Sequence, residues 1–263
     1  MEKTQAVVEE KWKLGSGAVV LSGRPTSCQG YVELINTSSE TVEPRALAIA
    51  GLDFGVAQVR APETARISAR LAPHGRMRAP IEVALEPTTP PGNYTGQLRC
   101  GAQQEKLVIQ VLESWDLRLL PQSVTVTAKP GEKFMLRTLI ANLGNVELAL
   151  PNSAQLPLEQ KLDLGQSLNV ALLAAGKQGF NQVLDRFAYA LAEGAAGPAT
   201  VSYGLEESRI RAGESRQVEL EIRLPEEMKN GKVYTGRIRF KNALLRIEVE
   251  CDDGVRMSPR RQK

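Results

Sequence analysis

The side chains most often used for catalysis and metal binding are few and scattered in this sequence. His74 is the one histidine and lies in a Pro-x-Gly turn, so we expect an exposed turn residue. A single histidine excludes a multi-histidine metal site, and an exposed turn histidine is a poor candidate for a histidine-dependent triad. Cys28, Cys100 and Cys251 show no Cys-x-x-Cys spacing, and we expect three free thiols, as in a reducing compartment.

Neighbouring acidic residues are also poor candidates for acid–base chemistry. The pairs fall in predicted turns or at the terminus: Glu206-Glu207, Glu226-Glu227 and Asp252-Asp253. Adjacent residues on a strand point to opposite faces, so such a pair does not converge on one bond. Phosphate-binding loops of the Gly-x-x-x-x-Gly-Lys-Ser/Thr kind are missing from the sequence. The sequence therefore predicts a protein that is not an enzyme and that binds no metal or cofactor.

A short motif occurs twice, as Gly-Asn-Tyr-Thr-Gly at residues 92–96 and as Gly-Lys-Val-Tyr-Thr-Gly at residues 231–236. Each copy follows an alternating apolar stretch and a turn that contains proline. We interpret the motif as the marker of the sixth strand in a repeated domain. Tyr94 and Tyr234 would each anchor a corner through a packed ring and a hydroxyl bonded to backbone, in preference to ligand contact. The glycines would relieve crowding: Gly92, Gly96, Gly231 and Gly236.

The elements that carry these residues are short, alternating and separated by Gly/Pro turns, which is typical of a β-sandwich. With 263 residues and 42% hydrophobic content, the chain can form two domains. We expect a mainly β protein with two tandem immunoglobulin-like β-sandwich domains, the second with an inserted α-helical segment. The expected division is an N-terminal arm at 1–15, a first sandwich at 16–113, a second at 114–251 and a basic disordered tail at 252–263.

The repeat also predicts where the insertion lies. Asn36 and Asn142 each end the second strand of a unit, and they precede Tyr94 and Tyr234 by 58 and 92 residues. The second unit therefore has 34 more residues between these landmarks. From about 156 to 194 the period of two is lost, and apolar residues recur at helical spacing. They form one predicted stripe, which could bind a partner or pack on its own domain: Phe180, Val183, Leu184, Phe187 and Leu191.

The second unit resembles bacterial immunoglobulin-like domains of the cell-adhesion-related and glycosidase-associated kinds. The similarity is carried by Lys-Pro-Gly-Glu at 129–132, Ala-Asn-Leu-Gly-Asn at 141–145, Ala-Gly-Glu at 212–214 and the second copy of the motif. It covers most of 117–251 apart from the insertion and is weaker over 16–112. These motifs are structural, so the resemblance implies a fold more than a role.

Charge and hydropathy limit the partners. The 33 basic and 30 acidic residues give a net charge of +3, without the clustered basic face that nucleic-acid binding requires. No stretch approaches the ~18 apolar residues of a membrane span, and no signal peptide is present. We expect a cytoplasmic protein, or an envelope-associated one if a leader was removed.

The favoured function is therefore a structural or assembly role, in which the sandwich domains position the helical insert or open strand edges against a protein partner or a second copy. The alternative is a carbohydrate-binding or enzyme-accessory module. Exposed coplanar aromatic rings on one sheet face would favour that alternative, whereas an exposed apolar helix face would favour assembly.

Overall fold

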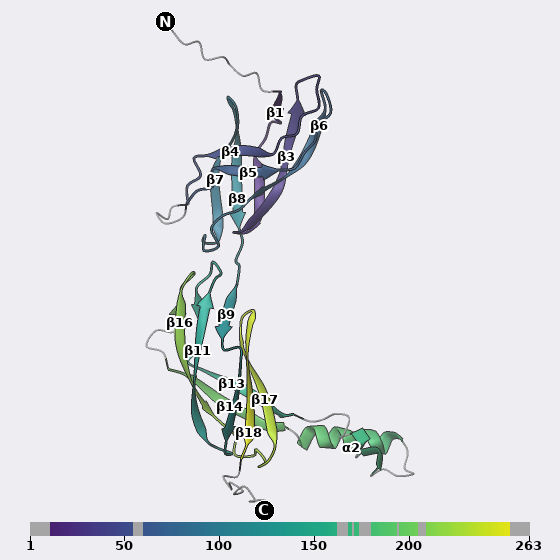
Figure 1. Ribbon diagram of the computed structural model, residues 1–263, viewed down its shortest axis with the longest axis vertical. Coiled ribbons are helices and arrows are strands. Elements are labelled where there is room, and N and C mark those ends of the chain that lie inside the picture. Colours follow the sequence, from purple (N-terminus) through teal and green to yellow (C-terminus); the bar gives the residue numbers. More distant parts are fainter. Residues whose placement is uncertain are drawn as a thin grey trace, which may run out of the picture. The chain divides into compact units, whose positions relative to one another are not determined.

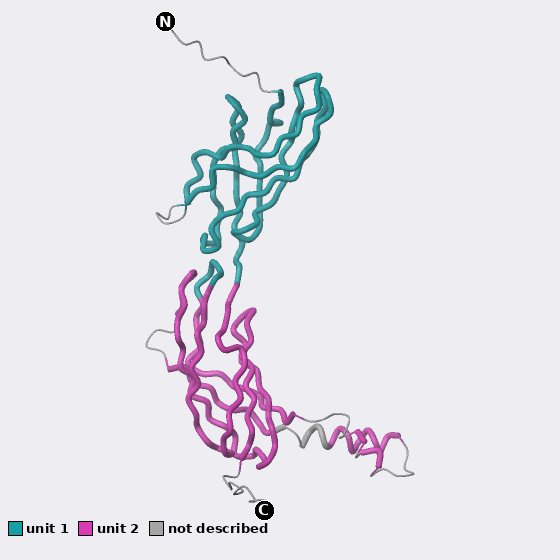
Figure 2. The backbone as a smooth tube through the Cα atoms, viewed as in Figure 1, with its two compact units in different colours: residues 1–115, 143–147 teal, residues 116–142, 148–263 magenta. Residues whose placement is uncertain are grey.

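The computed structural model describes residues 11–54, 60–161, 168–169, 171–173, 180–193, 195–204 and 209–252 (Figure 1). The chain is mainly β and divides into two compact units. Unit 1 comprises residues 1–115 with 143–147, and unit 2 comprises residues 116–142 with 148–263 (Figure 2). The expected fold class of two β domains, with a helix inserted in the second, is confirmed.

Unit 1 has one hydrogen-bonded set of eight strands. Along the chain these are β1 (Trp12–Leu14), β2 (Val19–Arg24), β3 (Ser27–Asn36), β4 (Ala46–Ala50), β5 (Thr64–Ile67), β6 (Arg76–Val83), β7 (Gly92–Cys100) and β8 (Gln103–Val111). Their order is β1-β3-β2-β8-β7-β4-β5-β6, and β3 also pairs with β6. The pairing from β2 around to β3 is therefore a closed ring, with β2 and β8 parallel.

Unit 2 repeats these strands with a helix and two short strands added. Its elements are β9 (Leu117–Leu120), β10 (Ser123–Ala128), β11 (Lys133–Asn142), β12 (Leu148–Ala149), β13 (Ser153–Gln160), α2 (Phe180–Glu193), β14 (Ala195–Tyr203), β15 (Arg209–Ile210), β16 (Ser215–Arg223), β17 (Val233–Phe240) and β18 (Ala243–Cys251). The main sheet has the order β10-β18-β17-β13-β14-β16-β11-β9. Its two ends, β10 and β9, are edges.

The register shows that the two units are copies. β1 pairs with the end of β3 as β9 pairs with the end of β11, with Trp12 opposite Asn36 and Leu117 opposite Asn142. The parallel pair β2–β8 corresponds to β10–β18. The bridge between Val42 and Leu71 has its counterpart in β12 and β15, where Leu148 lies opposite Ile210.

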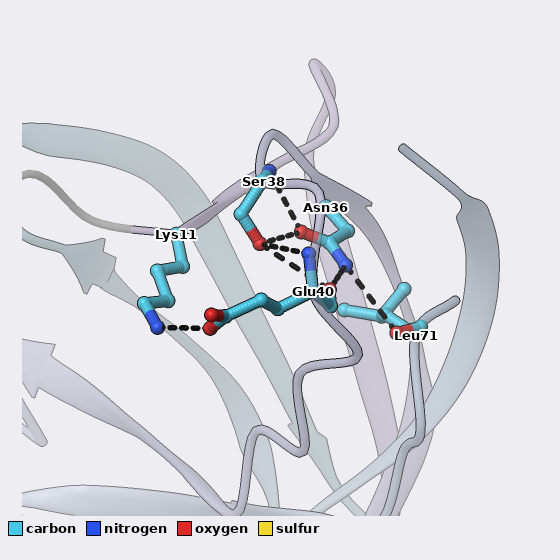
Figure 3. A network of polar contacts seen from close by, with 5 residues as sticks. All are labelled: Lys11, Asn36, Ser38, Glu40 and Leu71. Carbon is cyan, nitrogen blue, oxygen red and sulfur yellow. Dashed lines mark hydrogen bonds and ion pairs between the residues drawn. The ribbon is translucent and has the colours of Figure 1, made fainter. Parts of the chain in front are cut away.

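Asn36 and Asn142 have the same structural role at the end of their strands. Both are buried, and each donates its side-chain amide to a backbone carbonyl across the unit: Asn36 to Leu71 at 3.3 Å and Asn142 to Ile210 at 3.1 Å. Asn36 also donates to the Glu40 carbonyl at 2.7 Å, and the Ser38 N–H donates to its side-chain oxygen at 2.9 Å (Figure 3). An asparagine that pairs several buried main-chain groups is a structural landmark, which is why the spacing from it is informative.

The repeated tyrosines bond to backbone in both units. The Tyr94 hydroxyl donates to the Pro90 carbonyl at 2.7 Å, and the Tyr234 hydroxyl accepts from the Lys229 N–H at 2.9 Å. The Tyr234 ring is buried, and the Tyr94 ring packs against Phe54 at 4.7 Å between centroids. This is corner geometry of the immunoglobulin type.

Crowding explains one glycine of each motif. A Cβ at Gly236 would lie 2.8 Å from a methyl of Leu156, and one at Gly96 would lie 3.2 Å from the Ala50 carbonyl oxygen. Gly231 has φ of 72°, a conformation that side chains with a Cβ disfavour. The motif therefore packs β7 and β17 tightly against their neighbours.

The structure places several boundaries differently from those expected. The segment 12–14, expected in an arm, is β1 and pairs with β3, and residues 143–147 belong to unit 1. The insertion does not begin at 156, because β13 continues to Gln160. Residues 195–198 are part of β14, although they include a glycine and a proline. Residues 162–167, 174–179 and 253–263, which include most of the predicted tail, lie outside the described part.

Candidate protein-binding surface

The helix α2 is the described part of the insertion with the clearest sequence signal. Its 14 residues, FNQVLDRFAYALAE, combine good helix formers with apolar residues three and four apart. The sequence has Gly179 before it and Gly194 after it. Most of the length difference between the units falls between β13 and β14, where unit 1 has only the connection from β4 to β5.

Some residues of the predicted apolar stripe are packed, and others are exposed. Val183 is buried against Ala171, and Phe187 packs on this pair while half-buried. In contrast, Phe180 is 71% exposed and Leu184 is 45% exposed. Phe180 and Leu184 are one turn apart, so they share one face of the helix. The side chain of Leu191, the fifth predicted residue, lies outside the described residues.

More exposed apolar surface comes from the helical residues that precede α2. Leu172 and Leu173 are 50% and 76% exposed, and Leu168 is 40% exposed. The sequence predicted a helix here but gave no reason to separate the exposed leucines from Ala171, which is buried. We call Leu172, Leu173, Phe180 and Leu184 the helical patch. Large apolar side chains that gather on a surface mark sites of protein contact more often than scattered ones do.

The described polar side chains of α2 are exposed, and Tyr189 is 68% exposed as well. Asn181, Gln182, Asp185 and Arg186 all face solvent. The helix is therefore amphipathic, with most of its described surface uncovered. No described helix is long and apolar enough to cross a membrane.

The residues first considered for chemistry are placed apart. His74 is exposed in a turn with φ of 51°, as expected. Cys28, Cys100 and Cys251 are buried, and these three described residues form no disulfide. Burial raises the pKa of the Cys28 thiol from 9.0 to about 11, which keeps it protonated and weakly nucleophilic. Within the described ranges, no three His, Cys, Asp or Glu side chains gather as a metal site would require.

The carboxylates with shifted pKa values are held by structural partners. Hydrogen bonds from Arg76 lower the pKa of Glu33, one of them 2.8 Å long. The Arg211 N–H, at 2.9 Å, and then Arg216 lower the pKa of Glu214. Each of these groups is ionised and paired at neutral pH. Of the predicted acidic pairs, Glu226 and Glu227 are exposed, and Glu206, Glu207 and Asp253 lie outside the described residues.

A second surface feature is a groove on the outer face of β3, β5 and β6. It has a volume of about 530 Å³ and includes Tyr31, Arg66 and Glu82 in its lining. Tyr31 is 57% exposed, and the Arg78 guanidinium stacks over its ring at 4.7 Å. Of the aromatic residues on the described strands, Tyr31 is the one that is mostly exposed. A platform of several coplanar rings is therefore not formed on this described face.

Comparison with known proteins gives only distant likenesses among solved structures. No family model and no curated protein matches the sequence. Among solved structures, a protein of unknown function from Porphyromonas gingivalis is 11% identical, with a TM-score of 0.24 over 92% of this chain and 100% of that one. A titin fragment of three immunoglobulin domains is 10% identical, with a TM-score of 0.33 over 91% of this chain and 63% of its own. Domains 4 and 5 of the S-layer protein SbsC are 12% identical, with a TM-score of 0.25 over 62% and 66% of the two chains. Likeness at this level carries no information about activity or partners.

Proposed function

We propose that the protein is a non-catalytic assembly protein whose inserted helix binds a protein partner. One observation carries the proposal: Phe180 and Leu184 are exposed on the same face of α2, in a segment that the equivalent sandwich of unit 1 lacks. Covering such a face removes apolar area from water at about 25 cal/mol per Å². An amphipathic helix that lays its apolar face in a groove of a partner is a common mode of protein recognition.

The division of the stripe supports this role. Val183 and Phe187 pack with Ala171 and hold the helix, so Phe180 and Leu184 are available without unfolding the insertion. A few residues usually carry most of the binding energy of an interface, so a small anchor of this kind can be sufficient. The buried free thiols support a reducing compartment, and we propose that the protein acts in the cytoplasm.

The carbohydrate-binding alternative is less well supported. Sugar binding by stacking uses exposed ring faces, and the face of Tyr31 is occupied by Arg78. The groove around Tyr31 also has no second exposed aromatic residue among its lining residues. The assembly role therefore explains more of the described surface.

The test is co-purification from the source organism with a matched pair of variants. Phe180→Glu with Leu184→Glu should lose the partner, because two charges replace the apolar anchor. Asn181→Glu with Gln182→Glu places the same charges on exposed polar positions of the same helix and should retain it. A partner identified by this difference should then bind the purified protein at least about tenfold more weakly when Phe180 and Leu184 are changed. Retention of every co-purified protein by the folded Phe180→Glu, Leu184→Glu variant would refute the proposal.

A further inference from the structure

The two units differ at the first strand of their parallel pair, β2 in unit 1 and β10 in unit 2. The difference is whether this strand has a neighbouring strand on its other edge. In unit 1, β2 pairs with β8 on one edge and with the start of β3 on the other, from Leu21 opposite Gly30 to Arg24 opposite Ser27. In unit 2, β10 is the equivalent strand and the outermost strand of its sheet. Among the described residues it pairs only with β18, and β11 pairs with β16 and β9. Within the described part of the chain, one edge of β10 is therefore open.

Side-chain burial follows the same difference. Through their pairing with the last strand, Val19 and Leu21 of β2 correspond to Val124 and Val126 of β10. Val19 and Leu21 are buried, whereas Val124 and Val126 are only half-buried. In unit 1 the two side chains of β2 are buried because an extended strand lies beside them. An extended strand beside β10 would cover the two equivalent valines in the same way.

The main-chain groups of β10 also face the open edge in a definite order. The carbonyls of Gln122 and Ala128 accept hydrogen bonds from Arg246 and Asp252, so the peptide groups of the even-numbered residues point to β18. Successive residues of a strand present their N–H and C=O groups to opposite sides. The peptide groups of Ser123, Thr125 and Thr127 therefore point to the open edge.

The sequence of the edge is nearly symmetrical. Residues 123–127 read Ser-Val-Thr-Val-Thr. If two such strands pair antiparallel about an axis at Thr125, each Thr125 lies opposite its copy, Val124 lies opposite Val126, and Ser123 lies opposite Thr127. The outward peptide groups then meet in hydrogen-bonded pairs. The four valines form one apolar row, and the hydroxyls form another row on the other face.

We propose that the open edge of β10 is a self-association site, at which a second copy of this chain pairs its own β10 antiparallel about a two-fold axis. Pairing of this kind is isologous, so it closes at a dimer and does not continue into a fibre. The strand 123–128 contains no charged residue and no proline, the two features that proteins commonly use to block edge pairing. A partner with a different strand would lack this symmetry, so the second copy is the occupant that the sequence favours.

The proposed pairing does not depend on the helical patch. A contact between two short strands is small beside a standard interface of about 1,600 Å². We therefore expect a weak dimer, observable at about 0.1–1 mM protein. It would give the assembly role a second contact of a different kind.

Sedimentation velocity of the full chain over a concentration series tests the proposal. The wild type should change reversibly from monomer to dimer. Thr125→Pro removes an outward N–H while leaving the bonds to β18, so it should fold and raise the dissociation constant at least about tenfold. Thr125→Val keeps the main-chain groups and should dimerise like the wild type. If Thr125→Pro does not fold, Thr125→Lys serves instead, because it places two like charges opposite each other across the axis.

The outcomes separate this proposal from the helix-binding proposal. A wild type that stays monomeric up to about 1 mM protein would overturn it, as would a folded Thr125→Pro that dimerises as well as the wild type. The Phe180→Glu, Leu184→Glu variant should keep the dimer. If that variant loses the dimer while Thr125→Pro keeps it, the contact lies on the helix and β10 is not the site.

Discussion

Unit 1 and unit 2 share eight equivalent strands, but unit 1 closes its ring of pairings and unit 2 does not. The closing contact in unit 1 is β2 against the start of β3, where Gly30 lets the two strands approach. The equivalent position in unit 2, counted from Asn142, is Leu136. We call the contact of β2 with the start of β3 the seam. The comparison teaches that a few residues at this position decide whether the ring of strand pairings closes, without a change in strand order.

A second difference is the inserted helix. Unit 1 joins β4 to β5 through the shorter segment 51–63, whereas unit 2 places α2 between β13 and β14. Both differences add exposed apolar or unpaired groups to unit 2. Both surfaces that we propose for binding therefore lie in unit 2, the unit that departs from the simpler copy.

A large effect is expected at Gly30. A Cβ there would lie 2.3 Å from the Val20 carbonyl oxygen and 2.7 Å from a methyl of Leu21, so Gly30→Ala must push β2 away from β3. We expect a loss of about 3 kcal/mol in the free energy of unfolding of unit 1. The control is Gly204→Ala, whose Cβ would meet Glu219 at an ordinary 3.8 Å. Denaturant unfolding checks this, and equal stability of the two variants would mean that the seam is not tight.

Truncation of the equivalent side chains Leu21 and Val126 should lower the free energy of unfolding by unequal amounts. Leu21 is fully buried, so Leu21→Ala should cost about 2–5 kcal/mol through lost burial and a cavity. Val126 is half-buried, so Val126→Ala should cost about 1 kcal/mol or less in the monomer. Chemical denaturation at low protein concentration measures both. Equal costs would show that unit 2 is closed in solution as unit 1 is.

A smaller effect is expected from alkaline pH. Burial raises the pKa of Cys28 from 9.0 to about 11, so the folded state holds the proton more tightly than the unfolded state. This contribution is complete below pH 9 and is lost as the pH rises towards 11, with a size of about 1–3 kcal/mol. Phe134 occupies the equivalent position in unit 2 and does not titrate. Thermal unfolding between pH 8 and 11 should show the loss in the wild type and a smaller one in Cys28→Ala; identical profiles would contradict it.

Much of the fold could be predicted because the second unit repeats the strands of the first. The sequence separations between Asn36 and Tyr94 and between Asn142 and Tyr234 located the insertion, and helical spacing identified the segment of α2. The insertion was expected to begin at about 156, and it begins later because residues 156–160, with Pro157 among them, continue β13. In the structure, Gly197 has φ of 78° and lies at a register shift between β13 and β14, where an extra residue bulges from the strand.

The candidate surfaces were less predictable for a physical reason. Which residues of the helical stripe are exposed depends on the packing of Val183 on Ala171, a contact between separate segments. The open edge of β10 depends on a pairing that unit 1 makes and unit 2 does not, although both segments read as ordinary strands. Periodicity reports the faces of an element, whereas exposure of an edge is set by its neighbours in three dimensions.

Hydrogen exchange of individual amides tests the central claim, that unit 1 is closed where unit 2 is open. The Gly23 carbonyl accepts from Leu112 of the chain following β8, so the peptide groups of Ser22 face β3; the equivalent residue in unit 2 is Thr127. In dilute monomeric protein, the amide of Ser22 should be protected, and those of Thr125 and Thr127 should exchange far faster. Equal protection of Ser22 and Thr127 in the monomer would contradict the account.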